Sequence, residues 1–298
     1  MSEENIDDLK KELEVYKNIL EFHKLNSYYH PGHYYSVIPL VSEIKKRQNI
    51  IWKNKKNKEI KGLEFNITEQ LSLVDDLKKY NKLIDLPDQQ TNNKRFFLDN
   101  KFYFYSDAVL LFLMINNFKP KRIIEIGSGF SSALMLDLRE SFNLNLELSF
   151  IEPYPDRLFS LIKENDKERT KIINKNVQDV KISTFLDLEE NDILFIDSSH
   201  VSKIDSDVNF IIFEILPNLK SGVLIHFHDI YYPFEYPKIW SFNGINWNEA
   251  YLLKSFLMYN NEFKIKLFTN YLQIHYPQVF DDIKFFNKEA SSLWIQKL

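Results

Sequence analysis

The sequence predicts an α/β protein with a Rossmann-like, doubly wound and mostly parallel sheet, preceded by a helical extension at the N-terminus. From about residue 105, short apolar strands alternate with helical segments, and strands separated in this way form parallel βαβ units with right-handed crossovers. The strands are almost continuously apolar, which fits a sheet covered by helices on both faces. We therefore expect residues 1–104 to form an extension or lid and residues 105–298 to form the main domain.

The extension is predicted to begin with a helix over residues 3–25. Its apolar residues follow the 3-4 spacing of a coiled-coil seam for about two heptads: Ile6, Leu9, Leu13, Tyr16 and Leu20. This helix either packs on its own domain or pairs two subunits, and we expect a homodimer. Residues 45–61 hold eight Lys or Arg and one Glu, which favours a solvated helix face over a patch for a phosphorylated substrate.

The remaining elements follow from the apolar pattern and from the turn residues between its runs. The expected strands cover residues 122–126, 146–151, 171–173, 193–196, 223–227, 263–268 and 293–296. The expected helices cover residues 67–83, 108–115, 131–138, 156–163, 205–216 and 248–259.

Composition and charge exclude several classes of function. The chain of 298 residues is 44% hydrophobic and 27% charged, enough for a buried core. It has no cysteine, which excludes disulfides, thiolate metal sites, iron–sulfur clusters and cysteine nucleophiles. A net charge of -4 provides no overall basic field for nucleic acid. The acidic N-terminus and the short apolar runs predict neither a secretory signal nor a membrane span, so we expect a soluble cytoplasmic protein.

A glycine turn is the strongest local signal. The chain has only six glycines, yet Gly127 and Gly129 fall in one turn between a strand and a helix, where glycine permits positive φ and close backbone approach. About 25 residues further on, the next strand ends at Glu152, whose carboxylate could accept hydrogen bonds from both hydroxyls of a ribose.

Two cofactor classes use such a layout. A dinucleotide site needs a third glycine for close helix packing, and Ser132 stands at that position. Glu125, two residues before the first glycine, suits the positively charged amino group and sulfonium of S-adenosylmethionine. The residues therefore favour S-adenosylmethionine, with an NAD-dependent oxidoreductase as the alternative.

At this point the chain resembles a known family, the class I S-adenosylmethionine-dependent methyltransferases, and within it a bacterial branch related to the sugar O-methyltransferases of macrolide biosynthesis. Several segments carry the resemblance: RIIEIGSGFSS (122–132), FIEPYPDRL (150–158), NVQDV (176–180), DILFIDSSHV (192–201) and GVLIHFHDIYYPFEYP (222–237). The two late strands are similar to the antiparallel hairpin that closes the family's sheet.

The resemblance implies a role for each matching residue. Glu125, Gly127 and Gly129 would line the methionine end of the cofactor, and Ser128, Ser131 and Ser132 would lie in the turn and at the helix start. Glu152 would bind the ribose hydroxyls. Gln178 and Asp179 lie where the family contacts the adenine, and Asp197 would lie beside the methyl group.

Polar clusters end the fourth and fifth strands of the main domain, at Asp197 and His200 and at His228 and Asp229. Ligands of open α/β sheets bind at these strand ends. O-methylation needs a base for the acceptor hydroxyl, and a histidine can serve at neutral pH. We prefer His228 as the base, with His200 second.

Metal-assisted deprotonation is the alternative to a histidine base. Relatives hold a metal with acidic residues after these strands, so Asp197 and Asp229, with His228 as a further ligand, would bind magnesium. His228 stands where a second carboxylate often occurs, which leaves metal dependence open.

The expected function is methyl transfer from S-adenosylmethionine to a hydroxyl group of a small molecule such as a sugar or glycan precursor. The sugar rests on the resemblance alone. We expect no nucleic-acid or membrane partner. A non-catalytic assembly subunit is a further alternative.

Overall fold

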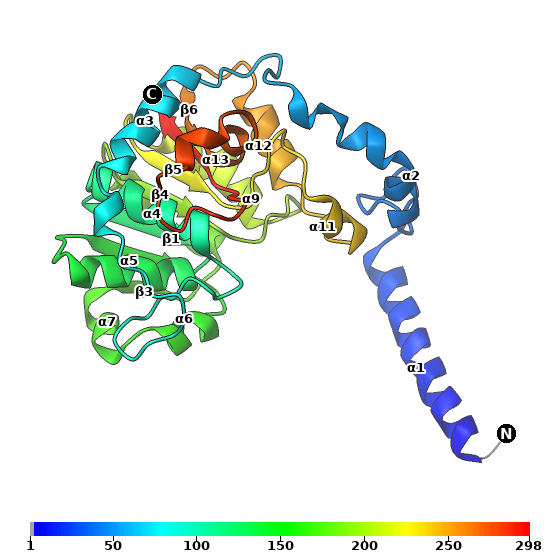
Figure 1. Ribbon diagram of the computed structural model, residues 1–298. Helices are drawn as coiled ribbons and strands as arrows, with labels where there is room; N and C mark the ends of the chain where they lie inside the picture. The colour runs from blue at the N-terminus through cyan, green and yellow to red at the C-terminus, as the bar shows by residue number, and fades with distance from the viewer. Residues whose placement is uncertain (1–2) are drawn as a thin grey trace. The chain divides into compact units, whose positions relative to one another are not determined.

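The computed structural model describes residues 3–298, apart from the side chains of residues 3–6, 23 and 54. Its strands form one seven-stranded sheet in the order β3-β2-β1-β4-β5-β7-β6 (Figure 1). The strands are β1 (Arg122–Ile126), β2 (Glu147–Ile151), β3 (Lys171–Ile173), β4 (Ile193–Ile196), β5 (Leu224–Phe227), β6 (Phe263–Phe268) and β7 (Leu293–Lys297). Strands β1 to β5 are parallel, and β7 is antiparallel to β5 and β6. The predicted fold class is confirmed.

Helices precede the first strand and lie between most of the later ones, as the alternating pattern predicted. The longer ones are α3 (Ile67–Lys78), α4 (Tyr105–Phe118), α5 (Phe130–Ser141), α12 (Glu249–Leu257) and α13 (Thr269–His275). Shorter ones are α6 (Asp156–Leu161), α7 (Glu164–Arg169), α8 (Ser183–Leu186), α9 (Asp207–Phe210) and α10 (Leu216–Asn218). A π-helical segment, Ile211–Ile215, joins α9 to α10, so the helix predicted over 205–216 is divided.

Burial in the core explains why the apolar pattern of the sequence predicted these strands and helices. Every residue of β4 and β5 is buried, as is every residue from Ser106 to Asn116 in α4. Residues buried on all sides lose the polar alternation of a half-exposed strand. No helix of the described chain is both long enough and apolar enough to cross a membrane.

The sheet has a switch point between β1 and β4. From β1 the chain moves outward through β2 and β3, then returns to the other side of β1 and moves outward through β4 and β5. The crevice outside the carboxyl ends of β1 and β4 is where sheets of this type bind ligands. Both polar clusters and the glycine turn lie at this edge.

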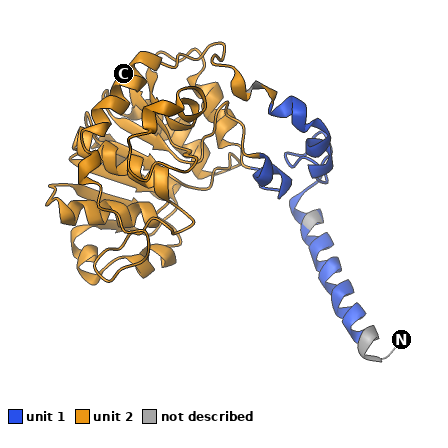
Figure 2. Ribbon diagram, in the orientation of Figure 1, with its two compact units in different colours: residues 1–52, 238–246 blue, residues 53–237, 247–298 orange. Residues whose placement is uncertain are grey.

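The chain divides into two compact units (Figure 2). The first holds residues 1–52 and 238–246, and the second holds residues 53–237 and 247–298. The expected boundary at residue 104 therefore differs from the observed one at residue 52. Residues 53–104 belong with the sheet because their apolar side chains, including Phe65, Leu77 and Phe96, are buried.

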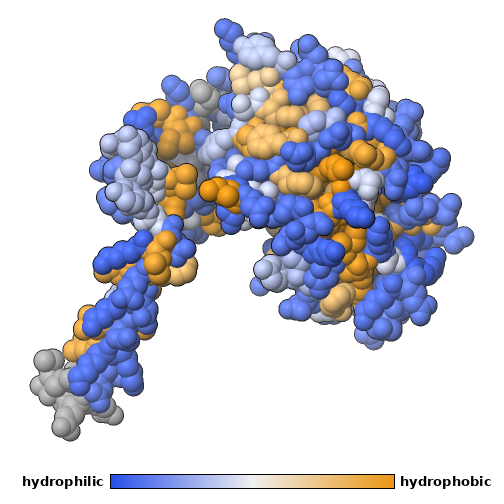
Figure 3. Space-filling model, turned by 180° about the vertical axis from the view of Figure 1, so that it is seen from behind, coloured by the Kyte–Doolittle hydropathy of each residue, from blue (hydrophilic) through white to orange (hydrophobic). Residues whose placement is uncertain are grey.

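The first unit contains the predicted N-terminal helix, α1 (Glu3–Asn26), with α2 (Val41–Ile51) and α11 (Lys238–Phe242). Trp52 and Phe242 pack edge to face at 6.1 Å, and Lys45 lies over the Phe242 ring. Hydrophobic and hydrophilic residues lie side by side along α1 (Figure 3). The Ile6 position of the predicted seam lies outside the described side chains, whereas the other four seam residues are 51–67% exposed.

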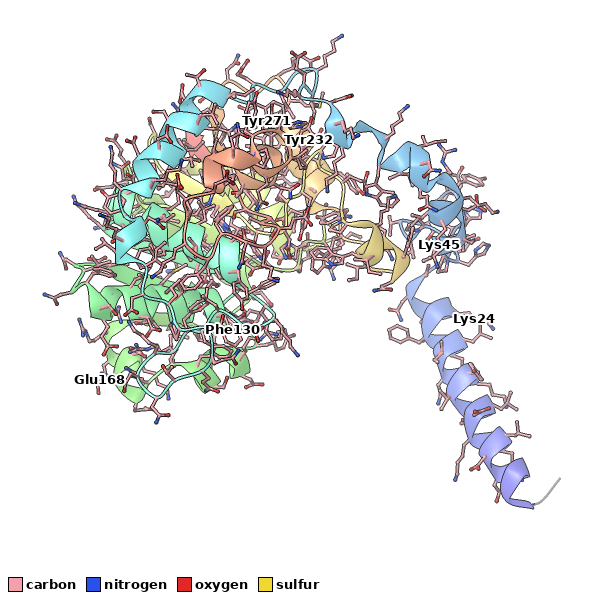
Figure 4. All side chains as sticks on the ribbon, in the orientation of Figure 1. Lys24, Lys45, Phe130, Glu168, Tyr232 and Tyr271 are labelled. Atoms are coloured by element: carbon pink, nitrogen blue, oxygen red, sulfur yellow. The ribbon has the colours of Figure 1, made fainter. Side chains whose placement is uncertain are left out.

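The segment after β5, residues 231–236, is rich in aromatic residues, and most of these belong to the core. Tyr232, Phe234 and Tyr236 are at most 2% exposed. Tyr232 packs edge to face on Tyr271 of α13 at 5.0 Å; both are labelled in Figure 4. The Tyr232 hydroxyl donates to the Asn57 carbonyl, so this segment also anchors the start of the second unit.

Candidate cofactor and acceptor site

A cavity of about 610 Å³ opens at the carboxyl edge of the sheet, entirely within the second unit. The glycine turn, Glu152, Gln178 and both polar clusters contribute to its wall. Further lining residues are Phe102, Tyr103, Phe130, Arg157, Lys203, Asp205, Asp207 and Trp247. Its volume is in the range of small-molecule sites.

The glycine turn is required by backbone packing. Gly127 has φ of +82°, and a Cβ atom there would lie 1.8 Å from the Asp197 carbonyl oxygen. The Asp197 N–H donates to the Ile126 carbonyl at 2.9 Å. Because the ends of β1 and β4 meet this closely, only glycine fits at position 127, and the wall behind a ligand is bare backbone.

Glu125 is placed differently from the expectation. It is fully buried, and its carboxylate accepts hydrogen bonds from the Ser131 and Ser132 hydroxyls. Burial raises the pKa of Glu125 to about 8, against the opposing effect of these donors. Neither Glu125 nor Ser132 lines the cavity, because their side chains bond to each other beneath the turn. The pair fixes the start of α5, and Ser131, Ser128 and Gly129 line the cavity.

Glu152 lies in the cavity wall at the end of β2. One carboxylate oxygen accepts from the Ser128 N–H at 3.0 Å and the other from the Tyr154 N–H at 2.8 Å. These bonds hold the carboxylate across the glycine turn. The spare lone pairs of both oxygens remain for a ligand, since each carboxylate oxygen can accept more than one bond.

Of the two residues expected near the adenine, the cavity includes only Gln178. Its amide nitrogen donates to the Asp205 carbonyl at 2.7 Å, and its amide oxygen is buried without a partner. Asp179 is exposed and does not line the cavity. The 3-10 turn Val177–Asp179 points the two neighbouring side chains in different directions.

The predicted polar residues after β4 and β5 come together. His200 Nε2 lies 3.4 Å from Asp197 Oδ1 and 3.8 Å from Asp229 Oδ2. One ligand atom from each of these three residues lies within 4.8 Å of the others, so the group could hold a metal ion. Burial opposes ionisation of Asp197, but His228 and His200 lower its pKa to about 2.

His228 is buried in the cavity wall beside this group. Its Nε2 lies 3.7 Å from Asp229 Oδ1, and its Nδ1 has no hydrogen-bond partner. Burial lowers the pKa of His228, but Asp229 and Asp197 raise it more, so the net shift is upward. His226, on the same face of β5, is core: its ring stacks on Phe195 at 3.9 Å.

Sequence reasoning missed the residues that hold His200. Glu249 is fully buried and lies 2.8 Å from His200 Nδ1, and the Trp247 ring lies 4.4 Å from the His200 ring. Trp247 ends the aromatic stretch that follows the fifth strand, and Glu249 lies at the start of the helix expected over residues 248–259. The sequence signal for Glu249 is a carboxylate in the first turn of a mainly apolar helix.

Comparison with known proteins relates this chain to a domain family and to an archaeal protein. Residues 124–230 match the profile of the family described as Methyltransferase domain. An uncharacterized protein of Archaeoglobus fulgidus is 36% identical over 167 residues, which is 54% of this chain and 74% of that protein.

Solved structures with a similar fold are more distant in sequence. The S-adenosylhomocysteine-bound methyltransferase of Podospora anserina is 15% identical, with 88% of this chain and 99% of that chain covered and a TM-score of 0.43. A plantazolicin methyltransferase in complex with a monoazolic desmethylPZN analog and S-adenosylhomocysteine is 12% identical, with 86% of this chain and 97% of that chain covered and a TM-score of 0.43. The family assignment rests on the archaeal relative and the domain match: the chain belongs to one family with the archaeal protein, and its Rossmann-like unit carries a methyltransferase domain.

Proposed function

We propose that the protein is an S-adenosylmethionine-dependent O-methyltransferase acting on a small hydroxylated acceptor. One observation carries the proposal. A single cavity joins Glu152, suited to a ribose, to the His228 and Asp229 pair, suited to a hydroxyl group. A methyl donor and an acceptor could therefore meet in one enclosed space.

The described residues fit the methyl donor. Gly127 presents bare backbone in the cavity wall, Glu152 offers a fixed carboxylate, and Gln178 and Ser198 each keep a buried oxygen without a partner. Buried polar atoms are normally hydrogen-bonded, so the last two point to a ligand in this wall. A dinucleotide is disfavoured because Ser132, at the third-glycine position, is bonded to Glu125 and Gly129.

When bound, S-adenosylmethionine supplies an electrophilic methyl group. The chain would orient the acceptor and remove its proton. His228 would take the hydroxyl proton, and Asp229, whose Oδ1 lies 3.7 Å from His228 Nε2, would stabilise the resulting imidazolium. The Ser291 hydroxyl donates to Asp229 Oδ1 at 3.1 Å and holds that carboxylate in place.

A divalent cation is the second route to the same deprotonation. Asp197, Asp229 and His200 offer converging ligand atoms, and a cation held there would lower the pKa of a bound hydroxyl. The sequence left metal dependence open and offered Asp197, Asp229 and His228 as ligands of a magnesium ion; the residue that converges with the two carboxylates is His200.

The acceptor class is proposed from the resemblance to the macrolide-sugar branch. A sugar or glycan precursor would present hydroxyl groups to the His228 and Asp229 pair. An assembly subunit without catalysis would have no need of the unpartnered polar atoms in the cavity.

Two measurements test the proposal. Calorimetry should detect binding of S-adenosylmethionine and of its demethylated product, and no binding of NAD. Methyl-labelled cofactor, supplied with a panel of sugars and sugar nucleotides, should then label an acceptor hydroxyl identified by mass spectrometry. Binding of NAD without binding of the methyl donor would exclude the proposal.

A further inference from the structure

We propose that Arg157 is an anion-binding residue of the cavity, and that the acceptor carries a phosphate or carboxylate group in addition to its reacting hydroxyl. The inference rests on the proposed function and narrows its acceptor class. Hydroxylated sugars in general are replaced by anionic ones, such as sugar phosphates and sugar acids.

A stack of aromatic rings holds the Arg157 guanidinium at the cavity wall. The guanidinium carbon lies 3.9 Å from the centroid of the Phe102 ring, which is a close cation–π contact. Phe102 is nearly parallel to Phe130, at 5.8 Å and 10°, and Phe130 packs edge to face on Phe97 at 5.4 Å. Arg157, Phe102 and Phe130 all line the cavity, so the stack presents the guanidinium to a ligand there.

The glycine turn supports the stem of the same side chain. A Cβ atom at Gly129 would lie 3.2 Å from Arg157 Cδ and 3.9 Å from its Cγ. The stem therefore rests on the bare backbone of the turn, while the guanidinium rests on Phe102. Because both parts are already in contact with the protein, less side-chain entropy is lost when the N–H groups bind a ligand.

The positive charge of Arg157 is not neutralised within the described chain. Arg95 and Arg122 each pair with carboxylates, whereas no described carboxylate lies within 4.0 Å of the Arg157 guanidinium. Arg157 is exposed, and stacking through its face leaves the N–H groups at its edge available. Such an edge binds a carboxylate or a phosphate through two parallel hydrogen bonds. The unpaired charge in the cavity wall therefore suits an oxyanion supplied by a ligand.

The wall connects Arg157 to the proposed base. Tyr103 follows Phe102 directly in the chain and lines the same cavity, and its ring lies 5.0 Å from the His228 ring. Two consecutive residues thus pack against the proposed base and against Arg157. A sugar with one hydroxyl at His228 could extend along this segment and place an anionic group at Arg157.

The methyl donor is the other molecule that could supply an oxyanion, because its methionine end has a carboxylate. Two positive charges, the sulfonium and the ammonium, accompany that carboxylate. The carboxylates of Glu152, Asp197 and Asp229 already line the cavity, and they complement the net positive charge of the donor. The unpaired cation is thus left for the acceptor.

Calorimetry on the full chain saturated with S-adenosylhomocysteine tests the anion site without requiring activity. Pyrophosphate and glucose 1-phosphate test for a phosphate group, glucuronate tests for a carboxylate, and glucose is the neutral comparison. Arg157→Gln should weaken binding of the anions at least about tenfold, because it removes a charge-assisted, two-bond contact. Arg157→Lys, which keeps the charge without the planar fork, should recover part of the affinity.

Arg169→Gln is the matched control for this experiment. Arg169 is exposed on α7 and does not line the cavity, so the same change of charge there should leave anion binding unchanged. Failure of the wild-type protein to bind any of the three anions, or equal weakening in both variants, would overturn the inference.

A second comparison separates the acceptor from the donor as the source of the oxyanion. S-adenosylhomocysteine has the methionine-end carboxylate, and 5′-methylthioadenosine lacks it. Arg157→Gln should change the affinity for neither, whereas a loss confined to S-adenosylhomocysteine would assign Arg157 to the donor and overturn the inference. Absence of S-adenosylhomocysteine binding in the wild-type protein is a different result, which would overturn the proposed function itself.

Discussion

The carboxyl group of Glu125 is fully buried beneath the glycine turn. Its ionisation therefore changes the free energy of unfolding. Burial raises its pKa from 4.5 to about 8. Between these values the unfolded chain has released the proton while the folded chain keeps it, so the unfolded state gains stability as pH rises. The contribution favours folding below pH 4.5 and is progressively lost up to about pH 8.

Replacing Glu125 by Gln should remove this dependence, because the amide can keep hydrogen bonds to Ser131 and Ser132 without titrating. The unfolding free energy of the variant, relative to wild type, should rise between pH 5 and pH 8, at most by about 1.4 kcal/mol per pH unit. Urea unfolding of both proteins at pH 5 and pH 8 measures this difference in the free energy of unfolding. The exposed Glu147, replaced by Gln, is the control, and parallel curves for Glu125→Gln and wild type would contradict the expectation.

Glu152→Ala should weaken binding of S-adenosylmethionine by removing a charged acceptor from the cavity wall. Hydrogen bonds to charged groups contribute about 1.5–3 kcal/mol each, and water would compensate for part of the loss. Asp179→Ala is the control, since Asp179 is exposed outside the cavity. Calorimetry compares the two, and equal losses would show that the cavity wall does not decide cofactor binding.

His228→Ala should lower turnover about 10²- to 10⁴-fold, the usual contribution of a general base, with cofactor affinity unchanged. The control is His275→Ala, a residue of α13 outside the cavity. Initial rates at saturating cofactor and acceptor measure the turnover of both variants and of the wild type. Full turnover in His228→Ala would transfer the role of base to His200.

At the scale of elements, one arginine joins the segment before α4 to two helices. Arg95 is 6% exposed, and its guanidinium donates to Asp137 of α5 at 2.8 Å and to Asp166 of α7 at 2.7 Å. The Arg95 N–H also donates to Asp137. Residues 53–104 are therefore tied to the sheet unit by a buried ion cluster as well as by apolar packing.

Arg95→Ala should lower the free energy of unfolding by about 3–5 kcal/mol, because it removes the cation that pairs with two buried carboxylates. Denaturant unfolding measures the change. Lys94→Ala, at the neighbouring position, should have a much smaller effect, because the Lys94 ammonium donates to the exposed Ser141 hydroxyl at 2.7 Å and not to a buried carboxylate. A small effect of Arg95→Ala would mean that water replaces the guanidinium.

The α1 helix carries the prediction of a homodimer. Leu9, Leu13, Tyr16 and Leu20 are more than half exposed, and isolated helices of this kind are marginal in water without a partner. Deleting residues 1–25 should halve the mass seen by light scattering. Leu13→Asp should do the same, whereas Val15→Asp, off the seam, should not. An unchanged mass after the deletion would mean that the helix packs within its own subunit.

At the scale of the whole molecule, ligand binding should stabilise the fold, because the cavity is assembled from the ends of four strands. S-adenosylmethionine at 100 times its Kd should add about 2.7 kcal/mol to the free energy of unfolding. The melting temperature should rise with S-adenosylmethionine and stay constant with NAD. A rise with both ligands, or with neither, would count against the cofactor assignment.

The sequence by itself determined the positions of the strands to within one residue, their mostly parallel direction and the position of the binding edge. These features follow from local patterns: apolar runs that remain apolar because both faces of the sheet are covered, and a glycine pair in a chain with few glycines. The strands at 122–126 and 193–196 were predicted with the observed bounds. The strand at 193–196 pairs in parallel with β5, so the carboxyl ends of these two strands lie at one edge and bring Asp197, His200 and Asp229 together.

Only the tertiary structure decided which side chains face the cavity. Glu125 and Ser132 pair beneath the turn, Asp179 turns to solvent, and Glu249 approaches His200 across 49 positions of the chain. Contacts of the same kind place the boundary between the two units at residue 52, whereas the expected boundary was residue 104. Such contacts depend on distances between elements far apart in sequence, and no local propensity or spacing encodes them.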